Sequence, residues 1–202
     1  MKRLRLCCLA ILFWHILIPA VGFTQDSINY KTWWVELGAG GFAAIEEVKG
    51  AKINLSYNSL RGNKLRSVEV NFYREASLFG PAPEEFYISG SYLFGSMEDA
   101  NERIKPFFLF GPGVMYGVRR GEYQGNSGGL FSSDMYEEVD FFSPKLSMII
   151  GSTIPFGPFG VFVPPGTPYV PVAVSLFIDL SNYRPMIGFN LNLILGQLSR
   201  RG

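Results

Sequence analysis

Polar and apolar residues alternate along most of the chain after residue 30, and Gly, Pro, Asn and acidic residues interrupt the alternation at intervals. The alternation is faultless in residues 51–58 and 67–72, and from Val170 to Leu180 every second residue is valine, leucine or isoleucine. A period of two residues is that of a β-strand whose two faces differ, and no convincing amphipathic helix follows residue 30. The pattern therefore predicts an all-β chain.

Eight segments carry this pattern, and most of them are 10–14 residues long. Strands of soluble sheets usually have about five or six residues, whereas a tilted strand that crosses a membrane needs about 9–11. The lengths therefore favour an eight-stranded antiparallel up-and-down transmembrane β-barrel. The predicted strands are residues 32–43, 50–60, 65–75, 85–95, 105–118, 139–152, 169–180 and 186–196.

The two faces of the predicted strands differ in polarity. One face of the last two strands is bulky and apolar, from Val170 to Leu180 and again from Ile187 to Leu195, while the opposite faces carry small or polar residues such as Asn54. A membrane barrel turns its apolar face to lipid, and a lipocalin-like soluble barrel turns it inward. The pattern favours the membrane barrel, and a soluble periplasmic protein that binds an apolar ligand stays as an alternative.

Aromatic residues cluster near the ends of the predicted strands, where we expect them to form the interfacial girdles of a membrane barrel. Aromatic residues are common in any β-sheet, so their number alone does not separate a membrane barrel from a soluble one. The residues concerned are Trp33, Trp34, Tyr57, Tyr73, Phe86, Tyr87, Phe94, Phe107, Tyr116, Phe141, Tyr169 and Tyr183.

Five charged residues fall on the face that is predicted to line the lumen. A buried charge needs a partner, and three acids with two bases can neutralise one another inside the barrel. Because an eight-stranded barrel is only wide enough for its own side chains, we expect a polar, side-chain-filled lumen, with a narrow pore or transport component as the alternative. The lumen charges are Glu36, Lys52, Glu69, Lys145 and Asp179.

The first 22 residues have the three parts of a secretory signal peptide. Three basic residues precede the apolar run 6–18, and small residues then indicate cleavage near Ala20, Gly22 and Phe23. The apolar run is shorter than the roughly 20 residues of a membrane-spanning helix, and an uncleaved N-terminal anchor is the alternative. The predicted organisation is a signal peptide at 1–22, a short segment at 23–30, a barrel domain at 31–197 and a tail at 198–202.

Removal of the signal peptide changes the composition. The 202-residue chain has a net charge of +1, but its first 22 residues hold three basic residues, both cysteines and the one histidine. The remainder has 15 basic and 17 acidic residues, and this net charge of −2 offers no basic excess for nucleic acid. Without His or Cys it cannot form a Ser-His-acid triad, a Cys-His pair or a His/Cys metal site. We therefore predict a non-enzymatic protein without catalytic residues, cofactor or metal.

Acidic residues are the remaining candidates for chemistry. The pairs Glu46-Glu47, Glu84-Glu85 and Glu137-Glu138 lie in predicted loops and are interpreted as solvated surface. The group at 98–102 has the same interpretation, although a weak loop Ca²⁺ site stays open. The Gly-rich stretch 121–129 lacks the features of a phosphate-binding loop and is either a mobile extracellular loop that contacts a partner or a flexible linker.

A signal peptide followed by eight long alternating strands resembles the small outer-membrane β-barrel proteins of the OmpA/OmpX type. The Gly-rich strands at 36–41 and 110–117 and the ending at 188–193 resemble the outer-membrane β-barrel domains common in Bacteroidetes-type bacteria. The resemblance covers residues 30–197, and it implies a bacterial outer-membrane location, contact with outer-membrane lipid and insertion by the barrel assembly machinery. Such proteins often end in an aromatic residue that this machinery recognises, whereas residues 198–202 contain none.

The pattern and the resemblance together predict a structural or surface-interaction role. With a periplasmic N-terminus, the polar segment 119–138 is an extracellular loop that is available to a partner. The Pro/Gly-rich segment 155–166 then falls on the periplasmic side, where it is too long for a simple turn. Either the strand count is wrong there, or this apolar segment covers the periplasmic end of the barrel.

Overall fold

The computed structural model describes residues 31–44, 48–76, 81–98, 104–126, 134–157 and 170–196. The predicted signal peptide, the segment 23–30 and the tail 198–202 lie outside the described residues. The described residues form eight strands, which are β1 (Lys31–Ala44), β2 (Lys49–Arg61), β3 (Lys64–Glu75), β4 (Phe86–Met97), β5 (Lys105–Asn126), β6 (Asp134–Phe156), β7 (Val170–Ser181) and β8 (Met186–Gly196).

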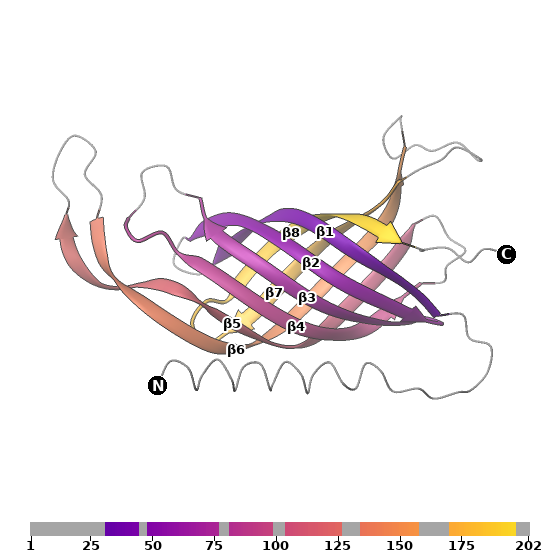
Figure 1. Cartoon of the computed structure of the whole chain (residues 1–202), viewed down its shortest axis with the longest axis horizontal. Helices are drawn as coiled ribbons and strands as arrows, with labels where there is room; N and C mark the ends of the chain where they lie inside the picture. Colours follow the sequence, from indigo (N-terminus) through magenta and orange to yellow (C-terminus); the bar gives the residue numbers. More distant parts are fainter. Residues whose placement is uncertain are drawn as a thin grey trace.

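Each strand pairs antiparallel with its neighbours in the sequence, and β1 also pairs with β8, so the sheet closes into a barrel. The closing register runs from Trp34 opposite Gly196 to Ala44 opposite Met186. Figure 1 shows the strands running obliquely around this barrel. The predicted all-β, eight-stranded up-and-down topology is confirmed. Within the described ranges, no helix is long and apolar enough to cross a membrane.

A two-residue connection joins β2 to β3, where Arg61 pairs with Lys64. Gly62 has a φ of +61°, a left-handed conformation that glycine adopts without steric cost. Arg61 and Lys64 therefore flank a tight turn, between the predicted strands 50–60 and 65–75. It marks one end of the barrel, which we call the turn end.

The opposite end carries an extension of β5 and β6, which we call the arm and define as residues 119–126 and 134–139. β4 pairs with β5 only as far as Val118, whereas β5 and β6 remain paired out to Asn126 opposite Asp134. Figure 1 shows this hairpin curving beyond the other strands. The prediction of a loop over 119–138 is therefore wrong for its described residues, because backbone pairing continues with register shifts on both sides of Tyr123. For the same reason, the described part of the Gly-rich stretch 121–129 is strand.

β6 also runs past its predicted end at the turn end of the barrel. Pro155 and Phe156, the first residues of the Pro/Gly-rich segment, pair with Pro171 and Val170 of β7. The strand count of eight is therefore correct at this point. The rest of the segment, at 158–166, lies outside the described residues.

The outer surface of the barrel is apolar. Leu176 is 59% exposed, Leu191 is 56% exposed and Ile150 is 60% exposed, and each projects from the middle of its strand. The alternate residues of the same strands, such as Ser175 and Asn190, are buried in the barrel. This inside-out distribution is that of a barrel surrounded by lipid, and it does not fit a lipocalin-like soluble barrel.

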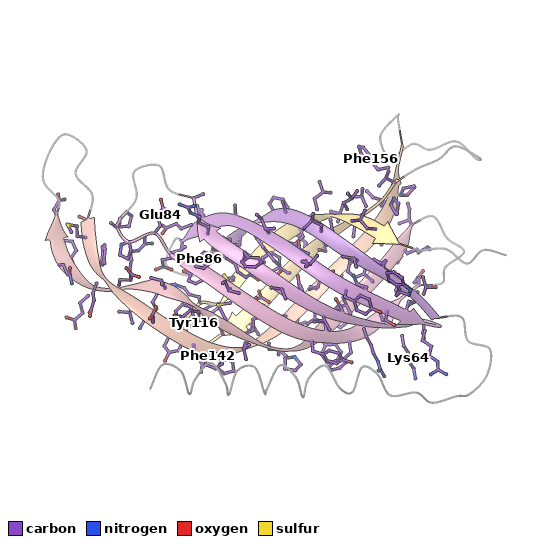
Figure 2. All side chains as sticks on the ribbon, in the orientation of Figure 1. Lys64, Glu84, Phe86, Tyr116, Phe142 and Phe156 are labelled. Atoms are coloured by element: carbon purple, nitrogen blue, oxygen red, sulfur yellow. The ribbon has the colours of Figure 1, made fainter. Side chains whose placement is uncertain are left out.

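Aromatic side chains on the outside lie toward both ends. Trp33 stacks on Tyr57 near the turn end, with ring centroids 6.3 Å apart. Figure 2 shows Phe86, Tyr116 and Phe142 grouped on neighbouring strands toward the arm. Trp33, Tyr57, Phe86, Phe94, Tyr116 and Tyr183 of the predicted girdle residues are exposed.

Five other residues predicted for the girdle are buried inside the barrel instead. The physical reason is the strand period, because adjacent residues such as Trp33 and Trp34 point to opposite faces. Proximity to a strand end says nothing about the face, whereas the odd or even position along the strand does. The inward residues are Trp34, Tyr73, Tyr87, Phe107 and Phe141, and Tyr169 lies outside the described residues.

Candidate functional site

The five predicted lumen charges all lie inside the barrel, each less than 8% exposed. Two ion pairs form among them. Lys52 Nζ lies 3.5 Å from Glu69 Oε1 on the neighbouring strand, and Lys145 Nζ lies 3.0 Å from Asp179 Oδ2. The structure therefore brings four of the five charges into pairs.

Aromatic rings surround these ion pairs. The hydroxyl of Tyr73 donates to Asp179 Oδ2 at 2.6 Å, and Lys145 Nζ donates to Ser89 Oγ at 2.9 Å. Lys52 Nζ lies 3.7 Å from the centre of the Phe177 ring. The lumen is therefore less uniformly polar than the sequence predicted, because large aromatic side chains share it with the charges.

The fifth charge, Glu36, has a different environment. Its carboxylate accepts hydrogen bonds from Trp34 Nε1 at 2.7 Å and from Asn192 Nδ2 at 2.7 Å. No cationic side chain among the described residues lies within ion-pairing distance of it. Glu36 lines a cavity of about 20 Å³, which has room for a single water-sized species.

Apolar side chains line the side of this cavity that faces the turn end, and Leu60 lies beside them. They come from the ends of β2 to β6 that meet there, where the buried polar residues Lys105 and Thr153 also point inward. The buried residues in question are Leu60, Leu65, Met97, Phe107, Leu109 and Ile149.

A second group of buried charges closes the arm end, and sequence reasoning missed it. It consists of Glu75, Glu85, Arg120 and Arg184, which we call the mouth cluster. Arg120 Nη1 donates to Glu75 Oε2 at 2.8 Å and Arg120 Nη2 donates to Glu75 Oε1 at 3.0 Å, as a bidentate pair. Arg184 Nε donates to Glu85 Oε2 at 2.9 Å, and Tyr87 donates to the same oxygen.

The mouth cluster corrects the interpretation of the Glu84-Glu85 pair as solvated surface. Glu84 is exposed and pairs with Arg74 at 2.8 Å, as expected, but Glu85 is 0% exposed. Glu85 lies two residues before Tyr87, so the strand alternation continues through it and turns it inward. The alternation of inward and outward residues in β4, extended by one residue before Phe86, would have predicted that Glu85 points inward.

The mouth cluster joins parts of the chain that are far apart in the sequence. Glu75 ends β3, Arg184 lies in the β7–β8 connection, and Arg120 lies at the base of the arm. The backbone nitrogen of Arg120 also donates to Glu85 Oε1 at 3.1 Å, and its Nη1 donates to the carbonyl of Pro81 at 3.2 Å. The cluster therefore anchors the arm to the rim of the barrel.

The other acidic candidates do not converge on a reactive site. Glu137 and Glu138 are exposed on β6, whereas the pair at 46–47 and the acidic positions at 99 and 102 lie outside the described residues. Within the described ranges, no group of three or more His, Cys, Asp or Glu side chains is placed to hold a metal ion.

The closed ring of eight up-and-down strands, with an apolar outside and charges inside, defines the class: this chain has the fold of the small outer-membrane β-barrels. Neisserial surface protein A superposes with a TM-score of 0.59 at 12% identity, over 83% of this chain and 99% of that chain. Ail, the attachment invasion locus protein of Yersinia pestis, superposes with a TM-score of 0.51 at 11% identity, over 83% of this chain and 99% of its own. No family model matches the sequence, and neither does any curated protein.

Proposed function

We propose that this chain is a non-enzymatic protein of the bacterial outer membrane that presents the arm to a partner outside the cell. The observation that carries the proposal is the arm itself, which extends beyond the barrel and is anchored there by buried ion pairs (Figure 1). An anchored hairpin holds its surface in one orientation, which lowers the entropy lost on binding. The structural neighbours support the proposal, since one is called a surface protein and the other an attachment protein.

The side chains of the arm indicate what kind of partner fits. Tyr123 is 58% exposed and packs edge-on against Tyr136, with ring centroids 5.4 Å apart. Four acidic side chains on the arm are exposed, while the guanidinium of Arg120 is turned into the mouth cluster. Aromatic faces combined with carboxylates suit a ligand rich in Lys and Arg, because both cation–π and ionic contacts are available to it. The acidic residues are Glu122, Asp134, Glu137 and Glu138.

Removal of most of the arm is expected to weaken the binding of a basic probe. In the shortened variant an Asn-Gly turn replaces residues 121–137, so that Arg120 and Glu138, which pair in the native register, flank the turn. With barrels in nanodiscs of zwitterionic lipid, we expect the affinity for a fluorescent nona-arginine peptide, measured by polarisation, to fall at least about tenfold, the loss of one to two ionic contacts.

A charge-only variant is the matched control for the shortened arm. Glu137→Gln with Glu138→Gln keeps the hairpin and removes two of its charges, so an intermediate affinity is expected. A nona-glutamate peptide should bind none of the three proteins. If the shortened barrel bound nona-arginine as tightly as the native one, the proposed role of the arm would be wrong.

The proposal also includes a lumen that does not conduct ions. The apolar side chains at the turn end, the central ion pairs and the mouth cluster lie one after another along the barrel. We therefore expect the protein, refolded and inserted into a planar bilayer, to give no steady unitary conductance at either polarity. Reproducible channel steps at single-molecule density would favour the pore alternative.

Contact with outer-membrane lipid and insertion by the barrel assembly machinery belong to the same proposal, supported by the apolar outer surface.

A further inference from the structure

The cavity beside Glu36 is lined by polar and apolar side chains, and three of its amide oxygens lack donors. The side-chain oxygens of Asn54, Asn190 and Asn192 are buried and accept no hydrogen bond in the structure. These three residues are 1%, 1% and 4% exposed, and all of them line the cavity together with Glu36 and Glu69. A buried amide oxygen without a donor is unfavourable, because the hydrogen bonds it made to water are not replaced. Three such oxygens at one cavity therefore indicate that something occupies it.

The orientation of one of these amides is fixed by its neighbour. Asn192 Nδ2 donates to Glu36 Oε2 at 2.7 Å, so the oxygen of Asn192 has to face the other way. A Cβ added to Gly38 would lie 1.9 Å from Asn192 Oδ1 and 2.6 Å from Asn54 Oδ1. The two amide oxygens therefore converge beside Gly38, where the absence of a side chain makes room for them.

The central lumen carries an excess negative charge, which a bound cation would neutralise. Lys145 pairs with Asp179, and Lys52 pairs with Glu69, which leaves the charge of Glu36 without a cationic partner among the described residues. The five central lumen charges, three acids and two bases, thus sum to −1. A buried unpaired carboxylate is strongly unfavourable unless a counterion or a proton neutralises it.

We propose that the cavity binds one small monovalent cation of the size of sodium, coordinated by the amide oxygens of Asn54, Asn190 and Asn192 and neutralising Glu36. The cavity volume of about 20 Å³ admits a single such ion. Carboxylate and carbonyl oxygens are the ligands that hard cations prefer. A water molecule has two donors for the three amide oxygens and leaves the charge of Glu36 uncompensated.

The same charge count disfavours a divalent ion. A divalent cation would change the net charge of the central lumen from −1 to +1, so a buried charge would remain. The described residues also lack the cluster of three or more acidic or other strong ligands that divalent sites use. The site is therefore expected to discriminate in favour of sodium over magnesium and calcium.

Equilibrium unfolding in urea tests the site on the full-length mature barrel refolded in lipid vesicles. The unfolding midpoint should rise with added NaCl and saturate, and it should not rise with N-methylglucamine chloride at the same ionic strength. Ligands that bind only the folded state shift the midpoint in this way. Glu36→Gln, which removes the charge and keeps one of the two accepting oxygens, should abolish the sodium-dependent shift.

A pair of matched variants separates the cation site from general damage to the lumen. Asn54→Leu removes a proposed ligand, whereas Asn71→Leu makes the same change at its cross-strand neighbour, whose buried oxygen also lacks a donor but does not line the cavity. Both variants are expected to unfold at lower urea, but only Asn54→Leu should lose the dependence on sodium.

If the native barrel showed equal midpoints in the two salts, the cavity would hold water beside a protonated Glu36, and the proposal would be overturned. Peptide binding by the arm does not enter this measurement, so the two proposals can fail separately.

Discussion

Glu85→Gln is expected to lower the free energy of unfolding of the refolded barrel by about 3–5 kcal/mol, the usual effect of removing one partner from a buried ion pair. Glu85 is 0% exposed, and its carboxylate accepts from Arg184 Nε, from the backbone of Arg120 and from Tyr87. Glutamine has the same size but leaves the guanidinium of Arg184 buried without its carboxylate. Urea unfolding in lipid vesicles, followed by tryptophan fluorescence, measures the change.

The neighbouring residue provides the control for this experiment. Glu84→Gln is the same chemical change one position earlier, but Glu84 and its partner Arg74 are both exposed to solvent. Exposed pairs add little to stability, so the unfolding midpoint should stay close to that of the native protein. Equal effects of the two substitutions would show that the mouth cluster does not stabilise the barrel.

Lys145→Glu is expected to have an effect at least as large. Lys145 Nζ lies 3.0 Å from Asp179 Oδ2, so the reversal places a second carboxylate beside a buried one. We expect the variant to lose the native shift in mobility between heated and unheated samples on a gel, because two adjacent buried carboxylates repel each other and lack a cation.

A double-mutant cycle keeps this prediction testable if Lys145→Glu fails to fold. Lys145→Met alone leaves Asp179 without its cation and should lower the free energy of unfolding by about 3–5 kcal/mol. Adding Asp179→Asn to Lys145→Met removes the unpaired charge, and should recover a large part of the loss. An additive double variant would mean that the two side chains do not interact.

The strands were predictable because lipid and lumen impose opposite preferences on alternate residues. In β7, Leu176 and Ile178 face outward while Ser175 and Asp179 face inward, and this alternation defines both the strand and its orientation. The same parity placed the five lumen charges on the inner face. It also separates Trp33 from Trp34, a distinction lost when aromatic residues are grouped by distance from a strand end.

The arm was missed because its environment removes the pattern on which the prediction depended. Beyond Val118 both faces of the β5–β6 hairpin meet solvent along most of their length, so polar residues are favoured on both sides and alternation disappears. Backbone hydrogen bonding does not need that alternation, and pairing continues to Asn126. A loop and a solvated hairpin therefore have similar compositions. The contacts within the lumen were not predictable either. Alternation along a strand tells whether a side chain points inward, but not which side chains of other strands it meets there.

The pairing of β1 with β8 has a consequence for biogenesis. Trp34 and Gly196 lie at opposite ends of the barrel sequence, so the last hydrogen bonds of the ring need almost the whole chain. A growing sheet of seven strands has two open edges whose backbone groups find no water in a bilayer, and such edges are strongly unfavourable in lipid. For a barrel inserted into lipid, as proposed for this chain, insertion and ring closure would therefore be coupled, and the edges would need shielding until Met186–Gly196 is paired. The pairing of β8 with β1 is the step that removes both open edges and completes the ring.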